Sequence, residues 1–484
     1  MNMTAVTGAT ALEAVNDVLA SATGAVNGLL WNHILIYLLV FAGFLFTVRL
    51  GFIQFRRLGH GFRSVMHGRE TEHGISSFQV FCTSMAARVG TGNMAGIAVA
   101  IVGGGPGAIF WMWVIALLGM STAFVEATLA QLFKVEDDEG FYRGGPAYYM
   151  EKGLGQRWMG ILFSIFLIIS FGFVFNAVQA NTIAGAIGDA FGIDKLMLGL
   201  VMVAATAFII VGGMKKVAHA SEVIVPIMAV VYLAVALVVV FLNLGKVPAA
   251  LALIIESAFG LEQFAGGALG ALIIGAKRGL FSNEAGMGSA ASVAASANPN
   301  PKHPASQGFI QMTGVFVDTL VICTASAAII LLSGVLDNPG DAQGIGLLQL
   351  ALTNELGGWA SYFVAFAIIL FSFSSIIANY SYAENNIMFL NGNTHKGLML
   401  FRIAVLGMVL FGSLAKVAVV WDLADASMGM MALVNIVAIL GLSGLAVKLA
   451  KDYVQQLDAG KTPSFDPARF PELKGKLAPG VWEK

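Results

Sequence analysis

The chain has 484 residues, of which 57% are hydrophobic and 11% charged, and its formal net charge is −1. Polar side chains are too few to cover a water-soluble globule of this size, so the composition indicates an integral membrane protein. The sparse basic residues exclude a nucleic-acid-binding surface. Cys82 and Cys323 lie in apolar runs without CxxC or histidine spacing, which excludes a disulfide framework and a cysteine metal site.

Eleven apolar runs approach the length that a membrane-spanning helix requires, about 20 residues. We therefore predict an all-α membrane protein with eleven transmembrane helices. The runs are spread along almost the whole chain and begin near Leu29, Ser77, Gly107, Met159, Leu196, Val223, Phe264, Phe309, Trp359, Gly397 and Met428.

Basic residues are concentrated in every second loop between the predicted spans. The loop after the first span carries five arginines from Arg49 to Arg69, and later loops of the same parity carry Lys302 and Arg402. The positive-inside rule places these loops in the cytoplasm, with the protein in the cell (inner) membrane. The other loops are short or acidic, such as Trp421 to Asp425. The amino terminus is then expected outside and the carboxyl terminus in the cytoplasm.

Two of the predicted spans are interrupted by glycine and polar residues. Span two contains RVGTGNMAG, Arg88 to Gly96, and span seven contains KRGLFSNEAG, Lys277 to Gly286. Glycine also serves close helix packing in membranes, so one break alone is weak evidence for an unwound segment. Paired interruptions in matching spans are typical of a secondary transporter, whose binding site uses the freed backbone groups.

The two interrupted spans lie five spans apart, so they cross the membrane in opposite directions. This predicts an inverted repeat of five plus five helices. The chain divides into an extracytoplasmic amino-terminal segment, an extra first helix and a basic loop (1–76), a first five-helix repeat (77–243), a second, inverted repeat (244–450) and a cytoplasmic tail (451–484).

Several ionisable residues lie within or close to the predicted spans, where a charge usually faces the protein interior with a partner. We expect Glu126 to accept hydrogen bonds from backbone N–H groups of a broken neighbouring helix. Asp318 is either a cation ligand or proton site, or it is neutralised by Lys277 or Arg278. Glu284 is a candidate gating residue if it pairs with a base such as Arg88.

Polar side chains without charge also fall inside the spans. Ser372, Ser374 and Ser375 lie together in span nine, where they either surround a hard monovalent cation or bond to carbonyls of their own helix. Gln179 in span four suits a bound carboxylate or amine, and an interhelical hydrogen bond equally well. No P-loop, metal-binding cluster or nucleophile elbow appears, so we predict neither an enzyme nor a primary pump.

Several long motifs resemble the sodium:alanine (alanine or glycine:cation) symporter family. They include GGPGAIFWMWVIALLG at 104–119, RGLFSNEAGMGSA at 278–290 and YRGGPAYYMEKGLG at 142–155, and the likeness runs from about Ser77 to Asn435. The resemblance implies the LeuT-type fold of the amino acid-polyamine-cation superfamily, with one additional helix ahead of its ten-helix core. It also implies sodium-driven uptake of alanine or glycine, with a proton occasionally replacing sodium, and no cofactor besides the coupling ion.

The resemblance further implies where substrate and ions bind. Backbone N–H groups of Gly90, Thr91 and Gly92 would receive the substrate carboxylate. Carbonyls in the stretch Gly279 to Asn283 would receive the ammonium group, with Gln179 as a side-chain contact; the substrate-site residues of that stretch are Gly279, Phe281, Ser282 and Asn283.

Sodium would be held by carbonyls of Ala86, Val89 and Phe371 and by the hydroxyls of Ser374 and Ser375. A second cation site would use Asn93 and Asp318. Arg88 stands where many family members have a small polar residue, which leaves the coupling ion open.

The sequence therefore predicts a sodium-coupled importer of small neutral amino acids that works by alternating access. Its partners would be the amino acid, Na⁺ and the lipid bilayer, with no nucleic acid and no obligatory protein partner. A proton-coupled symporter that uses Asp318 or Glu284 is one alternative, and a passive channel is another.

Overall fold

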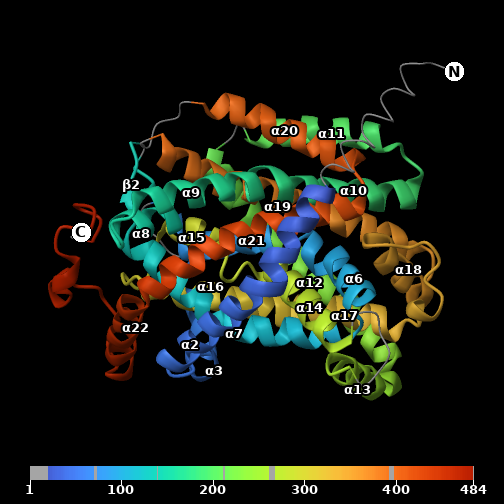
Figure 1. Cartoon of the computed structure of the whole chain (residues 1–484), viewed down its shortest axis with the longest axis horizontal. Helices are drawn as coiled ribbons and strands as arrows, with labels where there is room; N and C mark the ends of the chain where they lie inside the picture. Colours follow the sequence, from blue (N-terminus) through green and yellow to red (C-terminus); the bar gives the residue numbers. More distant parts are fainter. Residues whose placement is uncertain are drawn as a thin grey trace.

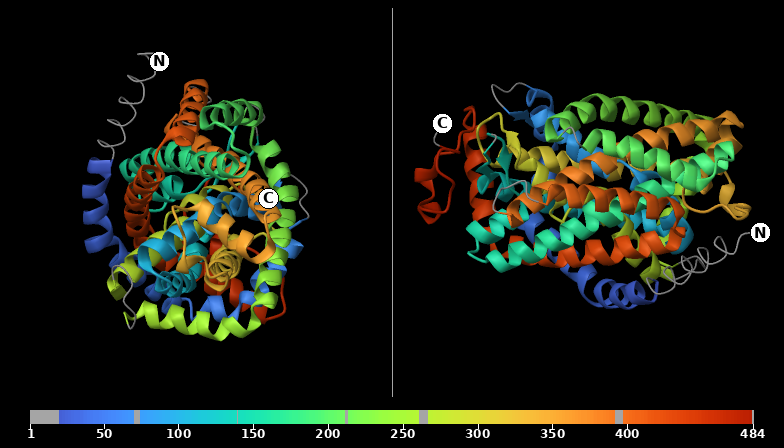
Figure 2. Two further views of the ribbon diagram at one scale, coloured as in Figure 1. Left: turned by 90° about the vertical axis from the view of Figure 1, so that its right-hand side faces the viewer. Right: turned by 90° about the horizontal axis from the view of Figure 1, so that it is seen from above.

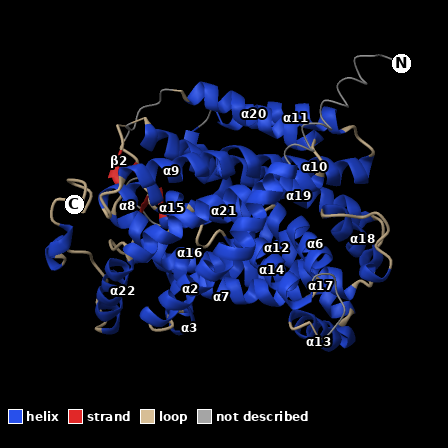
Figure 3. Ribbon diagram, in the orientation of Figure 1, coloured by secondary structure: helices blue, strands red, loops and turns tan. Residues whose placement is uncertain are grey.

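The computed structural model describes residues 20–69, 74–138, 140–210, 213–260, 267–391 and 397–482. Most of them lie in helices, and the few strands are only two residues long (Figures 1 and 3). Among the described residues, eight helices are long and apolar enough to cross a membrane, namely Ala20–Arg49, Ser77–Gly104, Gly107–Leu132, Arg157–Phe191, Ser221–Leu242, Ala305–Leu332, Trp359–Leu390 and Val417–Gly441. This confirms a multi-pass helical membrane protein.

The remaining predicted spans also coincide with helices. Two are short apolar helices, α11 (Lys195–Ile210) and α20 (Leu398–Leu414). The seventh corresponds to α14 (Gly267–Asn283) followed by α15 (Ser289–Ala294), and its predicted start at Phe264 lies outside the described residues. The amino terminus, residues 1–19, also lies outside them.

The eleventh span begins earlier than predicted. Helix α21 runs over Val417–Gly441, so the start near Met428 is wrong, and Trp421 to Asp425 is not a loop. The two aspartates in this stretch suggest a solvent-exposed connection, but Asp425 is buried and paired with basic side chains of α14.

Several spans consist of more than one helical segment, and the other helices connect them or follow the last one. The segments within spans are η1 (Trp31–Leu35) and α2 (Ile36–Arg49), α5 (Ser77–Arg88) and α6 (Thr91–Gly104), α9 (Arg157–Leu167), η2 (Ile168–Val174) and α10 (Phe175–Phe191), and α16 (Ala305–Val315), η4 (Phe316–Cys323) and α17 (Thr324–Leu332). The spans that consist of one helix are α7 (Gly107–Leu132), α11, α12 (Gly213–Leu242), α19 (Trp359–Leu390), α20 and α21. The connecting helices are α3 (Ile53–Arg56), α4 (Leu58–His67), α8 (Pro146–Lys152), η3 (Leu244–Lys246), α13 (Val247–Ala258), η5 (Val335–Asp337), α18 (Ile345–Leu356), α22 (Ser443–Asp458), η6 (Pro467–Arg469) and η7 (Pro471–Leu473).

The first helix break lies where the sequence predicts it, but the second lies further along the chain. Helix α5 ends at Arg88 and α6 begins at Thr91. Helix α14 continues through Lys277–Asn283, so the break covers only residues 284–288. There Glu284, Gly286 and Gly288 have φ values of 60°, 104° and 78°. A left-handed conformation is costly for a residue with a side chain, so Glu284 is held there by its surroundings.

Helix α7 is the central packing element, because α14, α16 and α2 all lie against it (Figures 1 and 2). Small residues permit the closest approaches. A Cβ atom at Gly107 would lie 2.3 Å from the backbone nitrogen of Ala258 in α13, and a Cβ atom at Gly275 would lie 2.6 Å from the carbonyl oxygen of Ala108. Backbone contacts of this kind stabilise helices in lipid, where no hydrophobic effect draws them together.

At one end of the molecule, short strands and the chain's last segment cover the helix ends. Strand β1 (Ile75–Ser76) pairs in parallel with β4 (Ala297–Asn298), and β2 (Val135–Glu136) pairs antiparallel with β3 (Tyr142–Arg143). The tail after α22 packs over this end, where the Trp482 Nε1–H donates to the Leu132 carbonyl over 3.1 Å. Figure 1 shows the carboxyl terminus and β2 on the same side.

An ion pair holds the tail to α22. The Asp452 carboxylate accepts hydrogen bonds from Arg469 Nη1 at 2.5 Å and from His303 Nε2 at 3.1 Å. Partial burial opposes ionisation of Asp452, but the His303 hydrogen bond and the Arg469 charge outweigh it and lower the pKa of this carboxyl.

The contact between α10 and α20 predicts a specific sensitivity to a single methyl group. A Cβ atom at Gly412 would lie 2.3 Å from the Ala177 carbonyl oxygen, whereas a Cβ atom at Gly407 on the same helix meets nothing within 4 Å. We expect Gly412→Ala to destabilise the protein by about 1–3 kcal/mol because the helices must separate. Gly407→Ala, the matched control, should be neutral or stabilising because alanine favours helix.

The measurement is the thermal unfolding midpoint of the purified protein in detergent. Equal midpoints for Gly412→Ala and Gly407→Ala would contradict the close approach of α20 to α10.

Candidate functional site

The start of α6 is held by two amide side chains. The Gly90 N–H donates to Asn93 Oδ1 over 3.0 Å, and the Thr91 N–H donates to Gln179 Oε1 over 3.1 Å. The Thr91 hydroxyl also donates to Gln179 Oε1, over 2.7 Å. These are two of the three backbone groups at which the family resemblance implies a substrate carboxylate. A bound carboxylate could replace Gln179 as the acceptor without any change in the helix start.

The serines of α19 approach the same break. Ser375 Oγ donates to the carbonyl oxygens of Ala86 at 2.7 Å and Phe371 at 2.9 Å, and Ser374 Oγ donates to Phe371 at 2.9 Å. Ser372 instead lies 2.9 Å from the Thr91 hydroxyl. The structure therefore brings together Ala86 and these serines in a cluster of oxygen atoms, the ligand type that a hard cation requires.

Two features allow this close approach. A Cβ atom at Gly90 would lie 2.4 Å from Ser375 Oγ, so only glycine fits between α19 and α10. Val89, which completes the predicted sodium ligands, is fully buried and ends the helical conformation with ψ at 89°. Ser374 and Ser375 also donate to the Phe371 carbonyl of their own helix, which is one of the two arrangements that the sequence predicts for these serines.

A second polar cluster joins α6, α14 and η4. Asn93 Nδ2 donates to Asp318 Oδ1 over 2.6 Å, Ser282 donates to Asp318 Oδ2, and Thr319 Oγ1 donates to Asp318 Oδ2 over 2.9 Å. All four side chains are fully buried. Asp318 lies in a π-helical segment, a feature that the sequence does not reveal and that is frequent at functional sites.

Aromatic rings line one side of the first break. The Phe281 ring lies 4.5 Å from that of Phe175 and 4.8 Å from that of Trp421, centroid to centroid. A Cβ atom at Gly92 would lie 2.9 Å from Phe281. Phe175 and Trp421 are not among the residues that the sequence predicts for the site. Phe175 precedes Gln179 by four residues and so shares its helix face, a signal that could have revealed it.

The other predicted residues of α14 face a different neighbour. Gly279 lies against Met112 of α7, and Asn283 Oδ1 accepts from the Ala285 N–H over 3.0 Å. The Glu284 N–H bonds to the Leu280 carbonyl over 2.9 Å, so the helix is intact at that point. An unwound run of carbonyls over Gly279 to Asn283 is therefore wrong, and only the last carbonyls, of residues 281–283, lie at a helix end.

The two basic residues of α14 pair with Asp425 of α21 and not with Asp318. Lys277 Nζ lies 3.2 Å from Asp425 Oδ2, and Arg278 bonds to Asp425 Oδ1. Arg278 also stacks over the Trp421 ring, with 4.5 Å between its Cζ and the centroid. Neutralisation of Asp318 by these bases is thus wrong, because their charges are compensated by α21.

Glu126 connects the second break to α21. Its carboxylate accepts from Asn435 Nδ2 over 2.5 Å, and the same Nδ2 donates to the Gly286 carbonyl over 2.9 Å. Asn435 therefore links Glu126 to the second break. Glu284 accepts instead from Ser289 Oγ over 2.6 Å.

Arg88 forms no ion pair with Glu284 among the described residues. Its Nη1 donates over 3.4 Å to the Gln311 carbonyl, its Nε has no partner there, and its guanidinium fills the space beside Gly314. The pairing of Arg88 with Glu284 is therefore wrong for this conformation.

These groups define a class of protein. Two interrupted helices in a membrane protein enclose buried backbone groups, amides and hydroxyls beside a cluster of oxygen atoms, which is the arrangement of a secondary carrier for a polar solute and a cation. Within the described ranges, no group of three or more histidine, cysteine or acidic residues could hold a metal ion.

Comparison with known proteins identifies the family. The profile of the sodium:alanine symporter family matches residues 16–467, and the chain belongs to this family of transporters, which are not enzymes. It is 52% identical to the probable sodium/glutamine symporter GlnT of Bacillus subtilis, covering 93% of this chain and 94% of GlnT. It is 52% identical to the amino-acid carrier protein AlsT of the same organism, covering 92% and 94%. It is 38% identical to the sodium/alanine symporter AgcS of Methanococcus maripaludis, covering 90% and 97%.

Gln179 supplies the acceptor at the first break, and its removal should impair transport. Gln179→Ala leaves the buried Thr91 N–H without its partner, at a cost of about 1–3 kcal/mol. We expect amino-acid uptake by the variant to fall by about ten-fold or more, while Gln179→Glu, which keeps an acceptor, retains more activity.

Thr182→Ala on the same helix is the matched control, because in the described part of the chain its hydroxyl bonds to the Val178 carbonyl of α10 and to no other helix. Uptake of labelled amino acid into proteoliposomes is the measurement. A similar loss in both alanine variants would show that α10 tolerates no change, and would remove the specific role of Gln179.

Proposed function

We propose that this chain is a sodium-coupled importer of alanine or glycine that works by alternating access. The observation that carries the proposal is the position of Gly90. This residue lies directly before the start of α6, whose N–H groups suit a carboxylate, and it also contacts the oxygen cluster that suits a cation. Thr91 is held by Gln179, and Gly90 packs against Ser375. An ion and a substrate bound on either side of Gly90 would stabilise the same conformation, so each would raise the affinity for the other.

The surroundings of the break favour a small substrate. Phe281 lies so close to Gly92 that even a methyl group there would collide with the ring. A substrate carboxylate at the Thr91 N–H would therefore have its α-carbon near the aromatic wall of Phe175, Phe281 and Trp421. This leaves little room for a long side chain and favours alanine and glycine over larger amino acids.

We propose for the ions the residues that the sequence suggests. Carbonyls of Ala86, Val89 and Phe371 and the hydroxyls of Ser374 and Ser375 form the sodium site, and Asn93 with Asp318 forms a second cation site. Asp318 already accepts from Asn93, Ser282 and Thr319, so its carboxylate is stabilised without a neighbouring base in hydrogen-bond contact.

The architecture we propose is the LeuT-type inverted repeat in eleven spans. Breaks in α5/α6 and α14/α15, five spans apart, support it, as does the packing of α6 on α14. We place the protein in the cell (inner) membrane with the arginine-bearing turn after α2 and the carboxyl-terminal tail in the cytoplasm.

Proteoliposomes provide the test of the proposed function. Labelled alanine should accumulate against its gradient when sodium is high outside, and glycine should compete for uptake. Uptake that is equal with and without a sodium gradient would overturn sodium coupling. Glutamine, which the name of the relative GlnT includes, is tested as a competitor of labelled alanine. Stronger inhibition by unlabelled glutamine than by unlabelled alanine would overturn the substrate assignment.

Proton coupling is the second candidate, because relatives bear names that include both ions. The chain is 36% identical to the sodium/proton-dependent alanine carrier protein of Bacillus sp. strain PS3. Uptake driven by a pH gradient in sodium-free buffer would select this alternative. Counterflow exchange of labelled alanine would distinguish either carrier from a channel.

Ser375 tests the sodium site at the level of one atom. Ser375→Ala removes a hydroxyl that lies between the Ala86 and Phe371 carbonyls, so we expect the sodium concentration for half-maximal uptake to rise by about ten-fold, the effect of roughly 1.4 kcal/mol. Ser413→Ala on α20 is the control, because that buried hydroxyl bonds to the Leu410 carbonyl of its own helix. An unchanged sodium requirement in Ser375→Ala would remove Ser375 from the site.

A further inference from the structure

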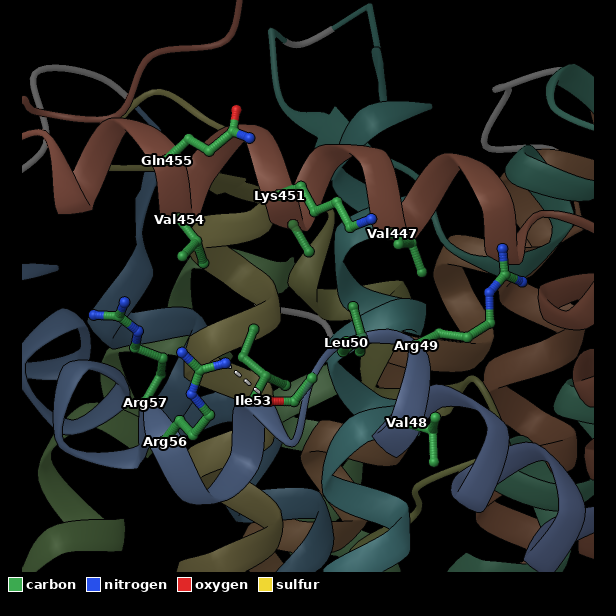
Figure 4. Close-up of a pocket in the computed structure, with 12 residues that line it drawn as sticks. Val48, Arg49, Leu50, Ile53, Arg56, Arg57, Val447, Lys451, Val454 and Gln455 are labelled. Carbon is green, nitrogen blue, oxygen red and sulfur yellow. Dashed lines mark hydrogen bonds between the residues drawn. The ribbon is translucent and has the colours of Figure 1, made fainter.

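A hollow lined by basic side chains lies where the first span ends. Helix α2 stops at Arg49, and the chain reverses through Gly51 and Phe52, whose φ values are 64° and 59°, into α3. Helix α22 crosses above this turn, and an open cavity of about 280 Å³ lies between the two segments. Figure 4 shows the arginines projecting from the turn below and Lys451 from α22 above.

The cavity is cationic. Arg49, Arg56, Arg57 and Lys451 line it, and no carboxylate does. Arg57 is paired with Asp458 at 2.5 Å. Arg49 donates over 2.7 Å to Ser443 Oγ, and Arg56 donates over 3.4 Å to the Gly51 carbonyl, so the partners found for these two arginines are neutral. The site therefore carries positive charge that an anion would compensate.

Apolar side chains also line the cavity. Ile53 contributes from the turn below, and Val447, Ala450 and Val454 contribute from α22 above. A small, fully hydrated anion gains nothing from these side chains. An anion attached to a hydrocarbon body would contact both the charged and the apolar side chains.

An exposed apolar stripe leads from the cavity along the first span. Tyr37, Phe41, Phe44 and Val48 are 67%, 56%, 61% and 47% exposed, and Val48 itself lines the cavity. Their spacing of four, three and four residues puts them on one face of the helix. In a membrane-spanning helix this face contacts acyl chains, so a chain lying along it would end at the cationic cavity.

We propose that this cavity binds the phosphate of an anionic phospholipid, with Arg49, Arg56 and Lys451 around the headgroup and one acyl chain along the stripe from Val48 to Tyr37. Basic pockets between helices at the membrane surface are a recognised type of site for such headgroups. The proposal requires only that the chain spans a membrane, so it stands apart from the choice of substrate and coupling ion. The lipid would join the first span to the helix that follows the last one.

The test is native mass spectrometry of the full chain in detergent, titrated with dioleoyl-phosphatidylglycerol, dioleoyl-phosphatidylcholine or inorganic phosphate. We expect phosphatidylglycerol to bind at least about ten-fold more tightly than phosphatidylcholine, and the triple variant Arg49→Gln, Arg56→Gln, Lys451→Gln to lose that preference. The matched control is Lys461→Gln, Lys474→Gln, Lys476→Gln. It removes the same charge from exposed residues that do not line the cavity.

The outcomes separate the proposal from its rivals. Equal lipid preference in the two triple variants would overturn the site, because charge alone, and not this cavity, would then select the lipid. Displacement of phosphatidylglycerol by millimolar inorganic phosphate would overturn the lipid and leave a soluble-anion site. An unchanged thermal unfolding midpoint in both lipid-free variants shows that they are folded. If the triple variant of the cavity does not fold, Arg56→Gln alone, on the exposed turn, repeats the comparison of lipid preference.

Discussion

Backbone hydrogen-bonding groups freed inside the protein are the constraint on which the site depends. Where a helix stops within a membrane protein, its N–H and C=O groups need partners from other helices. Side chains far away in the sequence supply them. Gln179 of α10 accepts from the Thr91 N–H at the first break, and Asn435, which is bonded to Glu126 of α7, donates to the Gly286 carbonyl at the second. The positions of α7 and α10 are thereby tied to the breaks.

Buried charged side chains also need partners from other helices, and the kind of partner differs from one residue to the next. Arg278 and Lys277 share Asp425, so two bases and one acid remain together between α14 and α21. Asp318 is served by hydroxyl and amide donors, and Arg88 by a carbonyl. Because a buried charge without compensation is costly, each of these groups has partners from another helix.

The sequence predicts the fold better than the contacts within the site. Apolar runs reveal the spans, and GTGN reveals the first break, because two glycines and an asparagine interrupt an otherwise apolar helix. The second break was placed too early, since Lys277 and Arg278 look like residues of a loop until Asp425, 147 positions away, is known to pair with them. The same pairing hides the start of α21. The π-helical segment at Asp318 has no compositional sign at all.

Site residues followed a similar division. Residues of the first break and the serines of α19 lie together in the structure. They could be predicted because the glycine at 90 and the two adjacent serines are local features of the sequence. Phe281 and Ser282 approach the first break, whereas Gly279 and Asn283 turn toward α7, since successive residues of an intact helix point in different directions. Trp421 is absent from the predicted site because the predicted start of its helix, near Met428, lies after it.

The parallel pairing of β1 with β4 has a mechanical consequence. Ile75 and Ser76 lie directly before α5, and their partners Ala297 and Asn298 follow α15, so one short ladder fastens the outer ends of both half-helices. Helices α5 and α15 also pack directly against each other, so the ladder extends this contact beyond the ends of the two half-helices. A displacement of one half-helix is therefore transmitted to the other through backbone hydrogen bonds as well as side-chain packing.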